Sequence, residues 1–227
     1  MTTPLRLVIF DVDGTLVDSQ AQIVAAMTTA FQTLDLPVPQ RERILSIVGL
    51  SLEQAMMRLA SDQDRDVHAA LVKNYREAFM DNRLRSGADG VPPLYPGARD
   101  ALETLSDRDD VLLGIATGKS RRGLTALIEA HELEGMFVTS QVADNHPSKP
   151  HPSMILTALA ETGVDARDAL MIGDTSFDMD MARSAGVAAL AVGWGYHPAE
   201  VLRQANDLLE TFAQLEPTLE QIWSVAS

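Results

Sequence analysis

The chain has 227 residues, of which 46% are hydrophobic and 22% are charged, a balance typical of a globular protein with a sizeable core. Acidic residues outnumber basic ones by 32 to 18, and the net charge of −14 argues against nucleic acid or an anionic membrane surface as a partner. The absence of cysteine excludes disulfides and thiolate catalysis, and no apolar run approaches the roughly 18 residues of a membrane span. We therefore expect a cytoplasmic protein.

Short apolar runs rich in valine, isoleucine and leucine recur along the chain, and helical patterns separate the later ones. The runs cover residues 5–10, 111–117, 136–142, 169–174 and 188–193. Continuous apolar runs of this length are typical of parallel strands that are buried on both faces. The fold class predicted from this pattern is α/β, with a doubly wound parallel sheet.

The segment after the first strand is different, because about 75 residues of helical pattern precede the next strand, whereas an ordinary crossover needs only a dozen or so. We interpret this segment as a helical cap inserted into the core. The predicted cap covers residues 17–90, and the predicted core covers residues 1–16 and 91–227. The turn-rich segment "SGADGVPPLYPG", residues 86–97, is predicted to lead back to the core.

Polar residues follow the predicted strands, where ligands bind in open parallel sheets. These residues are Asp11 and Asp13, Thr117 and Gly118, and Asp174 and Asp178. Lys149 lies in the loop before the predicted helix of residues 152–163. Two aspartates on the same side of an extended segment repel each other unless a cation lies close by. Carboxylates in this number are typical ligands of Mg²⁺, which binds one or two of them together with a substrate phosphate.

Four short motifs occur in order along the chain: "DVDGT", "ATG", "KPHP" and "GDTSFD". In these motifs, and in the place of the predicted cap, the sequence resembles the haloacid dehalogenase superfamily, subfamily I. The stretches "FDVDGTLVDS", "VGLSLEQA", "YPG" and "KPHPSMI" are most similar to its phosphoglycolate phosphatase branch. The resemblance implies a Rossmann-like core with an all-helical cap. It also implies Mg²⁺-dependent hydrolysis of a small phosphorylated metabolite such as phosphoglycolate, by a monomer or homodimer.

The resemblance also implies a role for each motif residue. Asp11 would be the nucleophile that forms an aspartyl-phosphate, and Asp13 would be the general acid and then the base, while its backbone carbonyl helps to bind the metal. Thr117 and the amide of Gly118 would hold phosphate oxygens, and Lys149 would neutralise them and keep Asp11 ionised. Asp11 and Asp174 would bind Mg²⁺, and Asp178 would bind it directly or through water.

Two other functions remain open at this point. A sugar-phosphate mutase uses the same four motifs but returns the phosphoryl group to its substrate, and the motifs alone do not separate the two activities. A phospho-acceptor switch without turnover is less favoured, because such a module is about half as long and has no inserted cap. The basic residues Lys119, Arg121 and Arg122 could help to attract phosphate, but the solvated start of a helix is the favoured interpretation.

Overall fold

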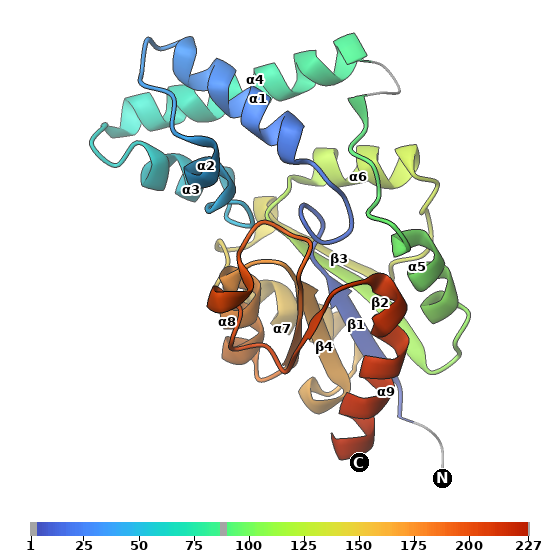
Figure 1. Ribbon diagram of the computed structural model, residues 1–227. Helices are drawn as coiled ribbons and strands as arrows, with labels where there is room; N and C mark the ends of the chain where they lie inside the picture. Colours follow the sequence, from blue (N-terminus) through green and yellow to red (C-terminus); the bar gives the residue numbers. More distant parts are fainter. Residues whose placement is uncertain (1–3, 87–89, 227) are drawn as a thin grey trace.

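A parallel sheet of six strands forms the centre of the computed structural model, which describes residues 4–86 and 90–226 (Figure 1). Its strands are β1 (Arg6–Phe10), β2 (Val111–Thr117), β3 (Thr139–Val142), β4 (Ala169–Gly173), β5 (Ala188–Val192) and β6 (Asp207–Leu209). The spatial order is β3-β2-β1-β4-β5-β6, and every neighbouring pair is parallel. The first strand therefore lies inside the sheet, between β2 and β4.

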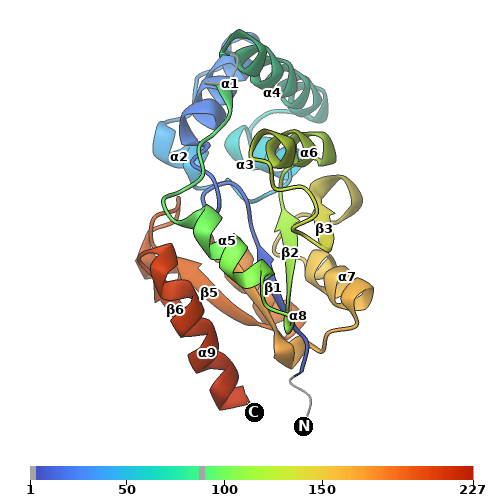
Figure 2. The same cartoon turned by 90° about the vertical axis from the view of Figure 1, so that its right-hand side faces the viewer.

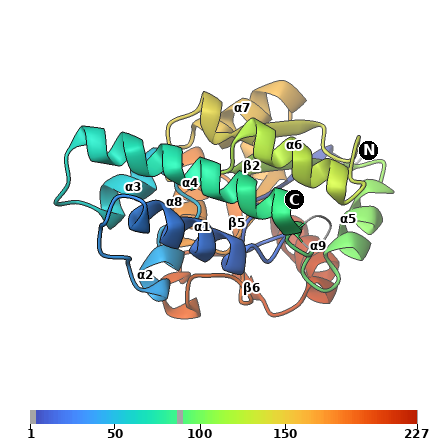
Figure 3. The ribbon, with the colours of Figure 1, turned by 90° about the horizontal axis from the view of Figure 1, so that it is seen from above.

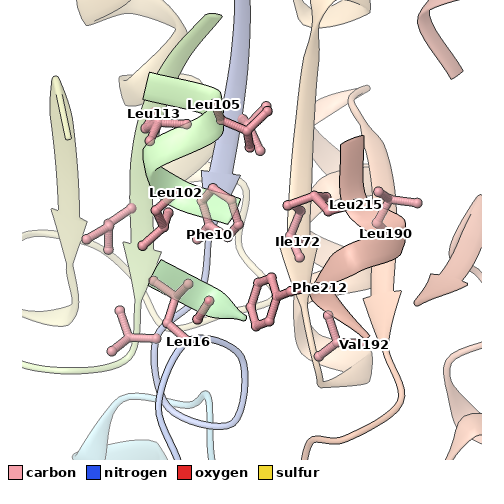
Figure 4. Close-up of a cluster of buried hydrophobic side chains, with 14 of the residues drawn as sticks. Phe10, Leu16, Leu102, Leu105, Leu113, Ile172, Leu190, Val192, Phe212 and Leu215 are labelled. Carbon is pink, nitrogen blue, oxygen red and sulfur yellow. The ribbon is translucent and has the colours of Figure 1, made fainter. Parts of the chain in front are cut away.

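Alternating side chains of the strands enter two separate hydrophobic clusters. Val8 and Phe10 of β1 belong to one cluster, and Leu7 and Ile9 belong to the other. In the first cluster, Phe10 lies close to side chains from the neighbouring strands and covering helices (Figure 4). Because both faces of the strand are buried, β1 is continuously apolar from Leu7 to Phe10 rather than alternating.

Helices cover both faces of the sheet. They are α5 (Ala98–Ser106), α6 (Arg121–Ala130), α7 (Ser153–Thr162), α8 (Ser176–Ala185) and α9 (Leu215–Ala226). Short 3₁₀ turns lie at η2 (Ala143–Asn145), η3 (Ala166–Asp168), η4 (Ala199–Val201) and η5 (Phe212–Gln214). Helices α5 and α9 lie on the face of the first cluster, whereas α7 and α8 pack on the opposite face (Figure 2).

Four helices lie beyond the carboxyl ends of the strands, at the top of Figure 1. They are α1 (Gln20–Gln32), α2 (Arg41–Leu45), α3 (Leu52–Leu59) and α4 (Arg65–Ser86). Helices α1 and α4 lie side by side, as the view from above shows (Figure 3). Met27, Phe31 and Met56 belong to a third hydrophobic cluster, so this helical unit has its own core above the sheet.

The structure confirms the predicted fold class, an α/β protein with a parallel sheet and a helical cap. The four cap helices fall within residues 17–90, and the domain boundaries themselves stay a prediction; part of the expected return linker, residues 87–89, lies outside the described residues. Strand β3 is shorter than predicted, because residues 136–138 precede the strand. In the described ranges, no helix combines the length and the apolar character that a membrane span requires.

Candidate active site

The loop after β1 carries Asp11 and Asp13 to the edge of the sheet that faces the cap helices. The backbone turns back at once, since the carbonyl of Val12 accepts hydrogen bonds from three following amides. Gly14 has a φ of +90°, and a Cβ atom at this position would lie only 2.2 Å from Asp174 Oδ2. Glycine is therefore required here both for the backbone conformation and for the close approach of the loop to Asp174.

A buried lysine lies between two of the predicted carboxylates. Lys149 Nζ is 2.9 Å from Asp11 Oδ1 and 2.6 Å from Asp178 Oδ1, and all three side chains are buried. Burial raises the pKa of Asp11 to about 6, although the charge of Lys149 acts in the opposite direction. Burial by itself would lower the pKa of Lys149, but Asp11 and Asp178 raise it well above the usual value. Lys149 therefore stays charged and favours ionised Asp11 at neutral pH.

Asp174 lies at the end of β4 and is held by groups that are distant in the sequence. Thr15 Oγ1 donates a hydrogen bond to Asp174 Oδ1 at 3.1 Å, and the amide of Tyr196 donates to Oδ2 at 2.8 Å. Burial, together with the negative charges of Asp11 and Asp178, raises the pKa of Asp174 well above its usual value. A group of buried acids whose charges repel each other in this way favours a bound cation.

Asp178 lies in the first turn of α8 and forms part of the capping box at the N-terminus of that helix. Its Oδ2 accepts hydrogen bonds from the amide and the hydroxyl of Thr175, and the Thr175 hydroxyl accepts from the amide of Asp178. This capping box orients one carboxylate oxygen toward the helix start and the other toward Lys149. Helix α8 thus fixes the position of Asp178 beside the other acids.

The donor set at this position is suitable for a hard divalent cation. Asp11, Asp174 and Asp178 each offer a carboxylate oxygen, and these atoms lie within 4.8 Å of one another. Asp11 Oδ2 has no hydrogen-bond donor among the described residues, whereas Oδ1 lies 2.9 Å from Lys149 Nζ. An ionised buried oxygen without a donor is unfavourable unless a cation binds it. Oxygen ligands of this kind are those that Mg²⁺ prefers.

The end of β2 brings Thr117, Gly118 and Lys119 to the same edge of the sheet. Lys119 Nζ lies 2.8 Å from Asp13 Oδ2, and the two side chains are only 11% and 13% exposed. The interpretation of Lys119 as part of a solvated helix start is therefore wrong. The pair forms because β1 and β2 are adjacent, so that their terminal loops meet although the residues are 106 positions apart.

A cavity of about 780 Å³ begins at Asp11, Asp13 and Thr117 and continues between the sheet edge and the cap helices. Gly118 lies in its wall, where a Cβ atom would be 2.7 Å from the carbonyl oxygens of Gly49 and Leu50 in the cap. The cap backbone therefore contacts the end of β2 directly. All of the motif residues named from the sequence lie in this cavity or in the buried ion network beneath it.

Sequence reasoning did not single out two residues that support the site, Thr15 and Tyr196, and it favoured a solvated helix start for Lys119. Thr15 is the last residue of the "DVDGT" motif, and Lys119 directly follows "ATG", so their positions gave a signal. Tyr196 contributes through its backbone amide, and its hydroxyl lies 2.9 Å from the Ser19 hydroxyl at the start of the cap. A contact made through a backbone amide leaves no pattern in the residue types.

Comparison with known families matches residues 8–192 to the model of the haloacid dehalogenase-like hydrolases. The chain belongs to this family. A probable phosphatase, IndB, of Dickeya dadantii is 38% identical over 215 residues, which are 92% of this chain and 91% of the relative. A phosphoglycolate phosphatase of Pseudomonas savastanoi pv. phaseolicola is 31% identical over 88% of this chain and 74% of the relative.

The likeness of this haloacid dehalogenase-like hydrolase to solved structures extends over almost the whole chain. A hydrolase from Pseudomonas syringae superposes with a TM-score of 0.83 at 27% identity, over 96% of this chain and 99% of the other. The resemblance drawn from the four motifs is thereby confirmed. The prediction of a phosphatase-like hydrolase is confirmed as well.

Proposed function

We propose that this hydrolase is a Mg²⁺-dependent phosphatase that cleaves a small phosphomonoester through an aspartyl-phosphate intermediate on Asp11. The observation that carries the proposal is the position of Asp11. It is buried beside Lys149, it has a carboxylate oxygen without a hydrogen-bond donor among the described residues, and it lines the cavity together with Asp13. Phosphoglycolate is the reference substrate to test, because relatives at about 30% identity carry the name phosphoglycolate phosphatase.

The first step forms a bond between an Asp11 oxygen and phosphorus, while the bond between phosphorus and the alcohol oxygen breaks. The leaving oxygen takes a proton from Asp13, which has the role of general acid. In the second step Asp13 accepts a proton from a water that attacks phosphorus, and the carboxylate of Asp11 leaves. Thr117 and the amide of Gly118 would bind phosphate oxygens, and Lys149 would balance their charge.

The carboxylates of Asp11, Asp174 and Asp178 and the backbone carbonyl of Asp13 would hold Mg²⁺. When bound, the ion supplies positive charge that lets a phosphate dianion approach a group of buried acids. Asp178 would bind the ion directly or through water. Asp178 is also held by Lys149 and by the N-terminal capping box of α8. These contacts would keep its carboxylate in place for direct or for water-mediated binding of the ion.

The Asp11→Asn substitution tests the nucleophile. It keeps the shape of the side chain but removes the attacking oxygen anion, so we expect turnover of phosphoglycolate and nitrophenyl phosphate to fall by several orders of magnitude, roughly 10³-fold or more. The matched control is Asp109→Asn, the same substitution at an exposed residue of the α/β domain. A variant of Asp11 that keeps a tenth of the activity would show that another residue attacks phosphorus.

Metal removal and product analysis complete the test. We expect hydrolysis to stop with a chelator and to return with added Mg²⁺, and full activity in metal-free protein would contradict the proposed metal.

Incubation with sugar phosphates distinguishes the alternatives: free phosphate indicates a phosphatase, an isomeric sugar phosphate indicates a mutase, and a single phosphorylation without turnover indicates a switch. The cytoplasmic location and the monomeric or dimeric state stay predictions.

A further inference from the structure

The cavity above Asp11 extends far beyond the space that a phosphate needs. Its volume of about 780 Å³ lies in the upper part of the usual range for sites that bind drug-sized ligands, roughly 300–1,000 Å³. Phosphoglycolate, with a leaving group of only a few atoms, would fill a small part of it. The remaining volume lies between the cap helices α1, α3 and α4 on one side and α6 on the other.

The part of the cavity that the helices enclose is mainly apolar. Its lining includes Ile23 and Met27 of α1, Leu52 of α3, Phe79 of α4 and Leu127 of α6. Phe79 stacks on Tyr75 with the ring centres 5.9 Å apart, and Tyr75 lines the cavity as well. Aromatic and aliphatic side chains that surround a space of this kind favour an apolar ligand, because its burial removes apolar surface from water.

The charged residues of the lining do not favour a second anionic group on the substrate. Three cations among the described residues line the cavity: Lys119, Arg76 and Arg122. Lys119 is paired with Asp13 and Arg76 with Glu53, the latter at 3.0 Å, and Arg122 is exposed to solvent. The carboxylate of glycolate would lose its hydration on entry and would need a cation in return. Asp144, which also lines the cavity, would repel it.

We propose that the preferred substrate of this site is a phosphomonoester of a bulky, largely apolar alcohol, with an aromatic ring in the space beside Phe79. The inference rests on the proposed function, since the phosphate must lie at Asp11. From there the leaving oxygen lies near Asp13, and the rest of the alcohol enters the apolar part between α4 and α6. Phe79 is then a specificity-determining residue rather than a part of the chemistry.

Substrates that differ only in the size of the alcohol test the proposal. 2-Phenylethyl phosphate, ethyl phosphate and phosphoglycolate all release a primary alkoxide, so differences in the leaving group's need for a proton are small. We expect kcat/KM for the phenylethyl ester to exceed that for the other two by at least about tenfold, the effect of filling an apolar pocket. Equal values, or a preference for phosphoglycolate, would overturn the inference and leave the phosphatase intact. Absence of hydrolysis of all three would overturn both proposals.

The Phe79→Ala variant tests the position of the ring. We expect the ratio of kcat/KM for phenylethyl phosphate to kcat/KM for ethyl phosphate, measured on the same variant, to fall close to 1. The matched control is Met57→Ala, which removes a side chain that is 49% exposed on α3 and does not line the cavity. An unchanged preference in Phe79→Ala, or the same loss in Met57→Ala, would contradict the assignment.

A binding measurement supports the test if Phe79→Ala does not fold. Titration calorimetry of the wild type with 2-phenylethylphosphonate and with ethylphosphonate, in the presence of Mg²⁺, compares the phenylethyl and ethyl groups without any chemical step, since the carbon–phosphorus bond is not hydrolysed. We expect the phenyl compound to bind at least about tenfold more tightly. Equal affinities would overturn the inference, whatever the behaviour of the variant.

Discussion

Lys149 is the residue on which the charges of the site depend. It contacts both Asp11 and Asp178 in a region that is closed to water, and Asp174 lies close to the same group of acids. A buried cation between carboxylates offsets their mutual repulsion, and its removal leaves charges that are neither hydrated nor paired. Lys149 therefore serves the stability of the fold as well as the proposed binding of phosphate.

We predict that Lys149→Met lowers the free energy of unfolding by about 3–5 kcal/mol, the usual cost of removing one partner from a buried ion network. Thermal and urea unfolding of metal-free protein measure the effect. The matched control is Lys73→Met on α4, where the side chain is 73% exposed and its ion pair is 3.9 Å long. A loss of stability no greater than that of the control would mean that the carboxylates are neutralised in another way.

Asp13 has two proposed roles that depend differently on the leaving group. An alkoxide needs a proton as it leaves, whereas a nitrophenolate does not, so Asp13→Asn should slow the first step far more for phosphoglycolate than for nitrophenyl phosphate. The second step needs Asp13 as base with either substrate. With nitrophenyl phosphate we expect a burst of nitrophenol, followed by a stalled protein with phosphate on Asp11. Rapid mixing and mass spectrometry of the quenched protein measure both, and equal losses without trapped phosphoprotein would contradict both roles.

At the scale of elements, the loop after β5 connects the core with the cap through His197. The ring Nδ1 accepts a hydrogen bond from the amide of Ser176 at the start of α8, at 3.1 Å. Nε2 must therefore carry the hydrogen, and it donates to the backbone carbonyl of Ser46 in the cap, also at 3.1 Å. Phe177 packs edge-on against the same ring and belongs to the hydrophobic cluster of the cap. The hydrogen bond from the Ser176 amide requires an Nδ1 without a hydrogen, so His197 is neutral in this arrangement.

We predict that this contact weakens in acid. Burial lowers the pKa of His197, although the Ser46 carbonyl and Asp178 act in the opposite direction. The folded protein thus binds fewer protons at this ring than the unfolded chain, whose histidine has a pKa of about 6.5, and the stabilisation present above that pH is lost as the pH falls. Unfolding measured between about pH 7.5 and about pH 5.5 should depend less on pH in His197→Gln than in the wild type. The control is His151→Gln at an exposed histidine, and an unchanged dependence in His197→Gln would contradict the prediction.

At the scale of the whole molecule, the cap helices and the sheet edge enclose the cavity together. Two further contacts of the cap backbone with the core lie near the site: the Ser51 amide donates to Ser148 Oγ at 2.8 Å, and Gly118 lies against the carbonyls of Gly49 and Leu50. Ser148 precedes Lys149, so one of these contacts is made by the loop that carries the buried lysine. A cap that closes over phosphate would exclude water during the first step.

We predict that amide exchange at residues 49–51 and 118–119 slows when Mg²⁺ and vanadate bind together, because closure of the cap protects these backbones. Mg²⁺ alone is the control, since it would bind to the carboxylates without the phosphate mimic over which the cap would close. Peptides from α9, on the sheet face away from the cap, should exchange at the same rate in all conditions. Equal exchange at residues 49–51 with and without vanadate would contradict a closing cap.

Much of the site could be predicted because its residues follow the strands directly. Asp11 and Asp13, Thr117 and Gly118, and Asp174 come immediately or almost immediately after apolar runs, and parallel strands bring such positions to one edge. Lys149 and Asp178 lie in recognisable motifs, and the length of helical sequence after β1 indicated the cap. The local sequence pattern is sufficient to predict site residues when they directly follow buried strands.

Tertiary structure alone decided the contacts between distant segments. The pairing of Lys119 with Asp13, the Tyr196 amide on Asp174 and the contact of His197 with Ser46 join residues 22 to 151 positions apart. Strand β6 was missed because its three residues gain their position only by pairing with β5. The apolar lining of the cavity comes from α1, α3, α4 and α6, whose side chains look like ordinary core positions in the sequence. Whether such a side chain fills a core or borders a cavity depends on the distance between packed elements, which no single segment encodes.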